Sequence, residues 1–257
     1  MRKSAFIYNH DLSNHTLRDD HPMKPSRLKY TYELLNAYGA FNTDKSLLVH
    51  PRKATFEELE LLHTREYISA VQDLSTNKNR TSAAKFGFSA VGDNPTYERM
   101  YDAALLSTGS TMLAAELISR KQVDTAFSIS GGLHHAAPDH ASGFCIFNDP
   151  ALAIKYFLSQ GHRVAYIDID AHHGDGVQNA FYDNDKVLTI SLHESGRYLF
   201  PGTGFVNESG RTPGVGYSVN VPLFPYTGDD IYVETFKAIV PPLIQSFGPG
   251  VLVTQLG

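Results

Sequence analysis

The sequence has almost no cysteine and no apolar run long enough to cross a membrane. Cys145 is the only cysteine among 257 residues, which excludes an intrachain disulfide and favours a reducing compartment. No hydrophobic segment approaches the length of a membrane helix, about 20 residues, and the N-terminal stretch MRKSAFIYNH lacks the apolar core of a signal peptide. We therefore predict a cytoplasmic protein that does not associate with membranes.

A strong charge of one sign is also missing. Lysine and arginine total 22 against 27 acidic residues, which gives a formal net charge of −5. This balance argues against a general affinity for nucleic acid, so we expect no direct nucleic-acid binding. The basic residues at 78–80 are predicted to form a solvated loop. A hydrophobic content of 42% and the length of the chain suit one globular domain, which we predict over residues 1–257.

Short apolar runs rich in β-branched residues alternate along the chain with longer amphipathic segments. Strands are predicted at 5–9, 125–130, 163–170, 186–193, 216–223 and 250–257. Helices are predicted at 25–39, 56–74 (as one or two), 97–121, 150–161 and 229–247, the last with a kink at Pro241 and Pro242. This alternation predicts an α/β fold with a central, mainly parallel sheet flanked by helices on both faces.

Polar side chains follow the apolar part of three predicted strands. His134 and His135 follow the first of them, Asp168 to Asp175 follow the second, and His193 ends the third. Sites in parallel sheets form at the carboxyl ends of the strands, so we expect these side chains to face one crevice.

The densest of these polar segments is YIDIDAHHGDG at 166–176. Residues two apart in a strand share a face, so Asp168, Asp170 and His172 are expected to project together. A carboxylate and an imidazole at this spacing form a reasonable chelating pair for zinc or a similar divalent ion. Gly174 and Gly176 allow a sharp turn into a following helix. An isolated Asp-x-His is explained equally well by a solvated polar loop, and the acidic and histidine-rich context lowers the weight of that alternative.

The segment GGLHHA at 131–136 supplies a second cluster. Adjacent histidines at a glycine-flanked strand end suit proton transfer, because imidazole titrates near neutral pH. Taken alone, the pair is explained equally well by surface histidines or a chance chelate.

Eight motifs together resemble those of the histone deacetylases, class I-like enzymes and their bacterial acetoin utilisation relatives. In order they are HPMKPSRL at 21–28, GDNP at 92–95, LSTGST at 106–111, GGLHHA at 131–136, ASGFCIFND at 141–149, DIDAHHGDGVQNAF at 168–181, TISLHE at 189–194 and FPGTG at 200–204. The resemblance covers essentially the whole chain. It implies the arginase–deacetylase α/β fold and metal-dependent hydrolysis of N6-acetyl-lysine in a protein or peptide substrate, with release of acetate.

The resemblance also assigns the metal ligands. Asp170 and His172 match two of the three zinc ligands of the family, and iron stays open as the alternative metal. In the family mechanism the metal polarises the acetamide carbonyl and activates a water molecule.

The histidine pair matches the proton-transfer groups of the family. The resemblance implies that His135 is the general base and later the acid, while His134 gives electrostatic help. Asp168 matches the carboxylate that supports His134, and Asp175 matches the one that supports His135.

Six further residues match substrate positions of the family, where two aromatic rings enclose the acyl-lysine methylenes. They are Asp93 at the rim, Phe144 and Phe200 in the tunnel walls, Gly132 and Gly143 beside them, and Arg27 in the channel associated with acetate release. Without the motifs, the two phenylalanines would be interpreted as ordinary packing and the arginine as a surface charge.

The family also binds potassium or sodium at two places. The inner set matches Asp168, Asp170, His172, Ser191 and Leu192, several of them through backbone oxygens. The outer set matches Phe181, Asn184, Val187 and Tyr217.

Two motifs of the family have no match in the sequence. One is an aspartate before Pro-Leu that supplies the third zinc ligand, and the other is a glycine-rich segment with the tyrosine that stabilises the oxyanion. The resemblance therefore implies a deacetylase domain that is incomplete at its C-terminal end, with the third ligand absent.

Three other functions are weighed against lysine deacetylation. An acetylpolyamine amidohydrolase of the same superfamily is the first alternative, but no long insertion that would restrict the tunnel is evident. A non-catalytic acyl-lysine-binding or truncated module is the second, against which the intact pair of His134 and His135 argues. Arginase-like activity fits the phenylalanine positions less well.

We predict that the 257-residue chain alone, supplied with zinc, hydrolyses acetyl-lysine peptides poorly. Two ligands make a weak metal site, and loss of one oxyanion donor typically lowers turnover by about 100- to 1000-fold. Acetate release from an acetylated peptide measures the effect. Robust turnover by these 257 residues would contradict the prediction.

Overall fold

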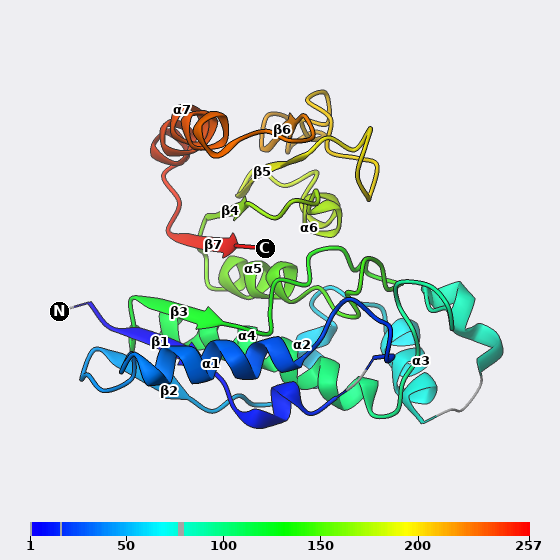
Figure 1. The fold of residues 1–257 in the computed structure, drawn as a ribbon. Coiled ribbons are helices and arrows are strands. Elements are labelled where there is room, and N and C mark those ends of the chain that lie inside the picture. The colour runs from blue at the N-terminus through cyan, green and yellow to red at the C-terminus, as the bar shows by residue number, and fades with distance from the viewer. Residues whose placement is uncertain (1, 16, 77–79) are drawn as a thin grey trace. The chain divides into compact units, whose positions relative to one another are not determined.

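The computed structural model describes residues 2–15, 17–76 and 80–257, so the predicted basic loop at 78–80 falls mostly outside the described residues. The chain divides into two compact units, Met1–Ala153 and Ile154–Gly257, called here the first and the second unit. In Figure 1 the first unit is coloured from blue to green and the second from green to red. Each unit has a parallel sheet with accompanying helices, which confirms the predicted α/β class.

The sheet of the first unit has the strand order β2-β1-β3, with both pairings parallel. The strands are β1 (Ser4–Ile7), β2 (Ser46–Val49) and β3 (Thr125–Ser128). The helices are α1 (Ser26–Ala37), α2 (Phe56–Leu59), α3 (Arg65–Ser75) and α4 (Met100–Ser119), with short 3₁₀ helices at His10–Ser13 and Arg80–Phe86. Phe6 of β1 packs with Tyr8, Leu12 and Leu28 in one buried cluster that joins the sheet to α1.

The sheet of the second unit has the order β6-β5-β4-β7, and all three pairings are parallel. The strands are β4 (Val164–Asp168), β5 (Val187–Glu194), β6 (Ser218–Leu223) and β7 (Val251–Gln255), and the helices are α6 (Asp175–Ala180) and α7 (Asp229–Phe247). Helix α5 (Asp149–Ser159) begins in the first unit and ends in the second. None of the helices among the described residues combines the length and the apolar character that a membrane crossing requires.

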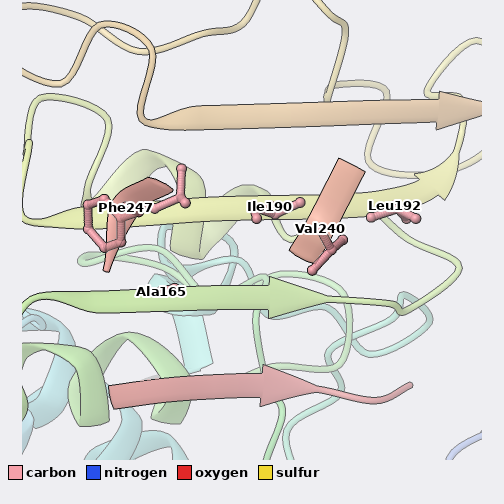
Figure 2. Close-up of a cluster of buried hydrophobic side chains, with 6 residues drawn as sticks. Ala165, Ile190, Leu192, Val240 and Phe247 are labelled. Carbon is pink, nitrogen blue, oxygen red and sulfur yellow. The ribbon is translucent and has the colours of Figure 1, made fainter. Parts of the chain in front are cut away.

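The core of the second unit lies between its sheet and α7. Figure 2 shows Val240 and Phe247 of α7 beside Ile190 and Leu192 of β5, and Ala165 of β4 belongs to the same buried cluster. Strand β5 is buried at every position except its last, and its polar residues Thr189, Ser191 and His193 alternate with apolar ones. Its carboxyl end and that of β4 carry the polar residues described below.

The predicted elements are present, and two details differ. Helix α7 includes both Pro241 and Pro242, and the kink expected there stays a prediction. The four-residue strand β2 has no counterpart in the prediction, because its short and partly exposed sequence carries little alternation. Strand β4 ends at Asp168 instead of Asp170 because the Asp168 carboxylate accepts the backbone N–H of Asp170, with Oδ1 3.1 Å from the nitrogen. A side chain that binds the backbone two residues on starts a turn.

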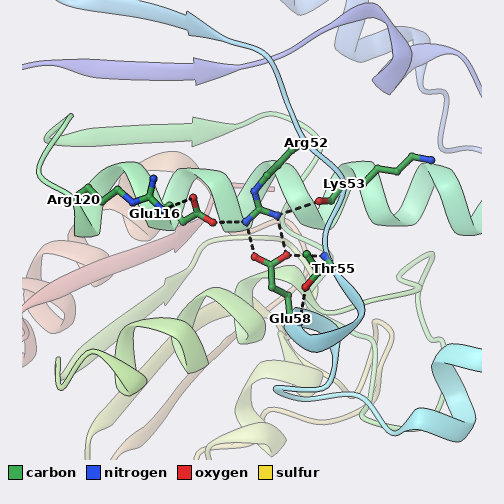
Figure 3. Close-up of polar contacts among 6 residues, drawn as sticks. All are labelled: Arg52, Lys53, Thr55, Glu58, Glu116 and Arg120. Carbon is green, nitrogen blue, oxygen red and sulfur yellow. Dashed lines mark hydrogen bonds and ion pairs between the residues drawn. The ribbon is translucent and has the colours of Figure 1, made fainter.

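An ion-pair cluster ties the segment before α2 to α4, as Figure 3 shows. The Arg52 guanidinium donates to both carboxylate oxygens of Glu58, at 2.5 and 2.8 Å, and also to Glu116 of α4. Glu58 simultaneously forms a capping box with Thr55, so one carboxylate both begins α2 and binds the arginine. The bonds from Glu58, and then those from Glu116, raise the pKa of Arg52.

The same segment crosses α4 at a glycine. The backbone N–H of Ala54 donates to Leu105 O at 2.9 Å. A Cβ on Gly109 would overlap backbone atoms of Arg52 and Ala54 and would lie 2.5 Å from the carbonyl carbon of Lys53. The close approach of the two backbones therefore depends on the missing side chain at this position.

We predict that Gly109→Ala lowers the free energy of unfolding by about 1–3 kcal/mol, because the added methyl group must push the two backbones apart. In an unhindered helix the same change would raise it by up to about 1 kcal/mol. Urea unfolding gives the sign. Ser119→Ala, near the end of the same helix, is the control and should be close to neutral; a more stable Gly109→Ala protein would refute the crowding argument.

Candidate functional site

The turn after β4 is built by carboxylates that accept backbone N–H groups. Asp168 is fully buried; besides accepting from Asp170 N, its Oδ2 accepts the Tyr166 hydroxyl at 2.7 Å. Asp170 repeats the pattern, since its Oδ1 accepts from His172 N at 2.8 Å. The chain therefore bends at Asp168 and again at Asp170. The predicted projection of both aspartates and His172 from one strand face is corrected to a pair of side-chain-to-backbone turns.

These turns bring the two predicted metal ligands together. His172 Nδ1 lies 3.0 Å from Asp170 Oδ1, and the other oxygen of Asp170 accepts from Gln255 Nε2 of β7 at 3.2 Å. A carboxylate oxygen and an imidazole nitrogen are donors that zinc or iron binds, so the pair fits two positions of such a site. Within residues 2–15, 17–76 and 80–257 no cluster of three or more His, Cys, Asp or Glu side chains able to hold a metal is found.

His173, the second histidine of the run, is held in one protonation state. Its Nε2 faces the side-chain oxygen of Gln178 at 3.2 Å and therefore carries the proton, which leaves Nδ1 to accept from the Thr203 hydroxyl at 2.8 Å. Gln178 is oriented in turn, because its amide nitrogen donates to Glu208. Burial, and then the neighbouring His193, lower the pKa of His173 to about 4. Sequence reasoning assigned no role to this residue.

His193 at the end of β5 is fixed in the same way. Its Nε2 donates to the carbonyl of Gly204 at 2.9 Å, and its Nδ1 accepts from Ser191 Oγ at 2.8 Å. The His173 and His193 rings lie 4.8 Å apart. Burial lowers the pKa of His193, so both rings are neutral near pH 7.

The loop that follows Phe200 packs on these two rings at a glycine. Gly204 has φ of +85°, and a Cβ there would overlap the His193 ring and lie 2.6 Å from His173 Cγ. The loop is also held by Glu208, which accepts from Gly204 N and Phe205 N at 2.9 and 3.0 Å. The buried histidines thus anchor the chain segment that carries Phe200.

All of the predicted monovalent-cation residues lie in the second unit. Asp168 of β4 is the register partner of Ser191 of β5, which places two inner residues side by side. At the outer set, the turn after α6 is closed by Asn184 N donating to Phe181 O at 3.0 Å, and Tyr217 O accepts from Thr189 N at 2.9 Å. The two cation sites stay predictions.

The histidine pair lies in the first unit, in the loop between β3 and α5. His134 and His135 have only 3% and 6% of their surface exposed, and their ring centroids are 4.0 Å apart. The alternative of surface histidines is therefore wrong. The predicted pairings of His134 with Asp168 and of His135 with Asp175 join residues of different units and stay predictions.

A third buried histidine supports this loop. His63 Nδ1 donates to Ala137 O at 3.1 Å, while its Nε2 accepts from the backbone N–H of Asn148 at 3.0 Å. The backbone N–H can only donate, so the ring is neutral with its proton on Nδ1. Burial lowers the pKa of His63 to about 4.

Three predicted substrate residues line one pocket of about 60 Å³ in the first unit, together with Tyr97, Ser130 and Leu133 among others. These three are Arg27, Asp93 and Phe144.

Phe144 is held in an unusual conformation at this pocket. Its φ is +71°, a region that bulky residues rarely occupy, and Gly143 before it also has a positive φ. Asn94 stabilises the bend because its side-chain oxygen accepts from Phe144 N at 3.3 Å. His21 lies edge-on to the phenylalanine ring at 4.7 Å. Strained backbone of this kind is concentrated at ligand sites. Asn94 and His21 were not among the predicted site residues.

Comparisons with known proteins agree on one family. Residues 21–257 match the family model described as the histone deacetylase domain. The chain is 43% identical to the acetoin utilization protein AcuC of Bacillus subtilis, over all of this chain and 66% of that protein. It is 38% identical to histone deacetylase 1 of Homo sapiens, over all of this chain and 53% of that protein. The chain thus spans about two thirds of the length of the bacterial relative and about half of the length of the human one.

Solved structures show the same likeness. An HDAC homolog from Aquifex aeolicus superposes with a TM-score of 0.90 at 34% identity, over 98% of this chain and 68% of that one. The structure of an HDAC homolog complexed with SAHA gives the same values. The arginase–deacetylase fold expected from the motifs is confirmed.

We predict that His63 makes the protein less stable in acid. Its pKa is about 4 in the folded protein and 6.5 ordinarily, so between these pH values the unfolded chain binds a proton that the folded one does not. The free energy of unfolding therefore falls as the pH drops through this window, by a total of about 3 kcal/mol from this residue. Thermal or urea unfolding of wild type and His63→Gln measures it, since the glutamine cannot titrate.

Above pH 6.5 the free energies of unfolding of wild type and His63→Gln should change with pH at the same rate. Below pH 6.5 the free energy of unfolding of the wild type should fall more steeply. Tyr67→Phe, which removes a buried hydroxyl bonded to Ile146 O, is the control. It should lower the free energy of unfolding by the same amount at every pH in this window. Equal slopes for wild type and His63→Gln would show that His63 does not titrate as inferred.

Proposed function

Because the chain belongs to the histone deacetylase family, we propose that it supplies the catalytic machinery of a hydrolase that removes the acetyl group of N6-acetyl-lysine in a protein or peptide, releasing acetate and lysine. The observation that carries the proposal is the buried contact of His134 and His135. Two adjacent imidazoles are costly to bury as packing groups, whereas proton transfer at a water-excluding site requires them there. The likeness to AcuC and to human histone deacetylase 1 supports the same reaction class.

In this proposal the two histidines divide the work. His135 takes a proton from the attacking water and later gives one to the leaving lysine amine, and His134 stabilises the charge that develops. Asp168 and Asp175 would hold the imidazoles in the required tautomers, as the resemblance to the family implies.

Asp170 and His172 would hold the metal, which we propose to be zinc, with iron as the alternative. The metal when bound polarises the acetamide carbonyl and lowers the pKa of a water molecule. The 3.0 Å approach of the carboxylate and the imidazole supports a shared ligand role for the two side chains. We also propose that potassium or sodium binds at the inner and outer sets of predicted monovalent-cation residues.

The substrate is proposed to enter between aromatic side chains. Phe144 and Phe200 would enclose the methylenes of the acyl-lysine, which contributes about 0.8 kcal/mol for each buried CH₂. Asp93 would accept hydrogen bonds from the substrate backbone at the rim. The pocket lined by Arg27 and Phe144 would receive the released acetate, because the guanidinium is a suitable partner for a small carboxylate. We further propose that both units belong to one catalytic domain in a cytoplasmic protein.

The test is the protein expressed from the complete open reading frame that contains these 257 residues, loaded with zinc. We expect hydrolysis of acetyl-lysine peptides in preference to acetylspermidine. His135→Gln should lower kcat by about 100- to 10,000-fold, the usual contribution of general acid–base catalysis. His140→Gln alters an exposed histidine of the same loop and should retain wild-type turnover.

Two results would count against the proposal. Preferred turnover of acetylspermidine would identify a polyamine amidohydrolase instead. Binding of acetyl-lysine peptide without hydrolysis, at saturating zinc, would identify a binding module.

A further inference from the structure

Two adjacent side chains at the start of α5, Asn148 and Asp149, hold the backbone on either side of His134. We propose that these two residues are positioning residues for the histidine pair, acting as a clamp on the loop that carries it. This inference rests on the proposed function, since it assigns the clamp to the proton-transfer histidines of that reaction. Neither side chain has any exposed surface.

Asp149 binds the loop before the histidines. Its Oδ1 accepts from Leu133 N at 2.8 Å, and its Oδ2 accepts from Gly132 N at 3.0 Å and from the Thr111 hydroxyl of α4 at 2.6 Å. Three donors converge on one carboxylate that has no contact with solvent. Burial raises the pKa of Asp149, and the three hydrogen bonds counteract part of this effect.

The loop lies so close to this carboxylate that its sequence is restricted. A Cβ on Gly131 would lie 2.5 Å from Asp149 Oδ2 and would overlap Thr111 Oγ1. Gly132 has φ of +89°, and its carbonyl accepts from His134 N at 3.0 Å. Asp149 therefore fixes the position of Gly132, and the hydrogen bond from His134 N to Gly132 O in turn restrains the backbone of His134.

Asn148 binds the loop after His134. Its amide nitrogen donates to His134 O at 3.2 Å and to Ala136 O at 2.9 Å. Its side-chain oxygen accepts from Ala151 N at 3.0 Å, which caps the first turn of α5. Because Ala151 N–H can only donate, the amide cannot be flipped, and both of its hydrogens point to the loop.

The two side chains together restrain the backbone from Gly132 to Ala136. Both side chains belong to the start of helix α5, which is more rigid than a loop. Their hydrogen bonds therefore limit the motion of the loop that carries the histidine pair. The general-acid and general-base positions then depend on a carboxylate and an amide that touch neither substrate nor metal.

The decisive variant is Asp149→Asn, which keeps the shape and replaces one accepting oxygen by an NH₂ group. That group cannot accept from Gly132 or Leu133, so the loop loses one anchor. In the zinc-loaded protein from the complete reading frame we expect kcat to fall by about 10- to 100-fold, as for other small misplacements of catalytic groups. KM should change by less than about threefold, because Asp149 forms no hydrogen bond with Phe144 or Phe200, the proposed tunnel walls.

Tyr67→Phe is the matched control. It removes another fully buried hydrogen bond of the first unit, from the hydroxyl to Ile146 O at 2.6 Å, without touching residues 131–136. We expect a lower thermal midpoint and unchanged kcat. A loss of kcat in Asp149→Asn no greater than in the control would overturn the proposal.

Amide hydrogen exchange tests the clamp without reference to activity. In Asp149→Asn the Gly132 or Leu133 amide should exchange faster by at least about tenfold, while Tyr67→Phe leaves both unchanged. Thr111→Val, which removes one donor to the carboxylate and retains both amide bonds, should give a smaller acceleration. If the Gly132 and Leu133 amides exchange at the wild-type rate in Asp149→Asn, the clamp is overturned, whether or not the wild type hydrolyses acetyl-lysine. If the wild type does not hydrolyse acetyl-lysine, only the proposed function is overturned.

Discussion

Buried carboxylates that accept backbone N–H groups determine the course of the chain at two of the three polar strand ends. A carboxylate without solvent must be given donors, and the nearest donors are the amides of the turn itself. Asp168 accepts from Asp170 N and thereby ends β4, while Asp149 accepts from Gly132 and Leu133 and thereby shapes the loop after β3. In each case the carboxylate, whose burial is energetically unfavourable by itself, determines the conformation of the neighbouring backbone through these hydrogen bonds.

Fixed hydrogen-bond partners give three other buried histidines a structural role. His63, His173 and His193 each face at least one group whose donor or acceptor character is fixed, a backbone N–H, a glutamine oxygen or a carbonyl. Their lowered pKa values keep them neutral near pH 7. They act as rigid hydrogen-bonding rings that fix loops, and proton transfer in the proposed reaction is confined to the pair at 134 and 135.

Periodicity predicts most of the fold, and it fails where a side chain binds the backbone or a strand carries little alternation. Strands and helices follow from local patterns, so they are found with errors of a few residues. The end of β4 is wrong because alternation continues to Asp170 while a side-chain bond has already turned the backbone. Asn148 and Asp149 lie inside a motif that sequence analysis identifies, yet their roles depend on partners about 15 residues away, a distance at which no spacing rule applies.

The crowded contact at Gly204 constrains the order in which this protein can change over generations. The rings of His173 and His193 occupy the space that a methyl group on Gly204 would need. An alanine at 204 avoids these clashes only after both rings have been replaced by smaller side chains, and its φ of +85° would still strain it. Gly204, His173 and His193 are therefore expected to change together. Replacement of the glycine first would destabilise the protein, whereas replacement of the histidines first would not create this clash.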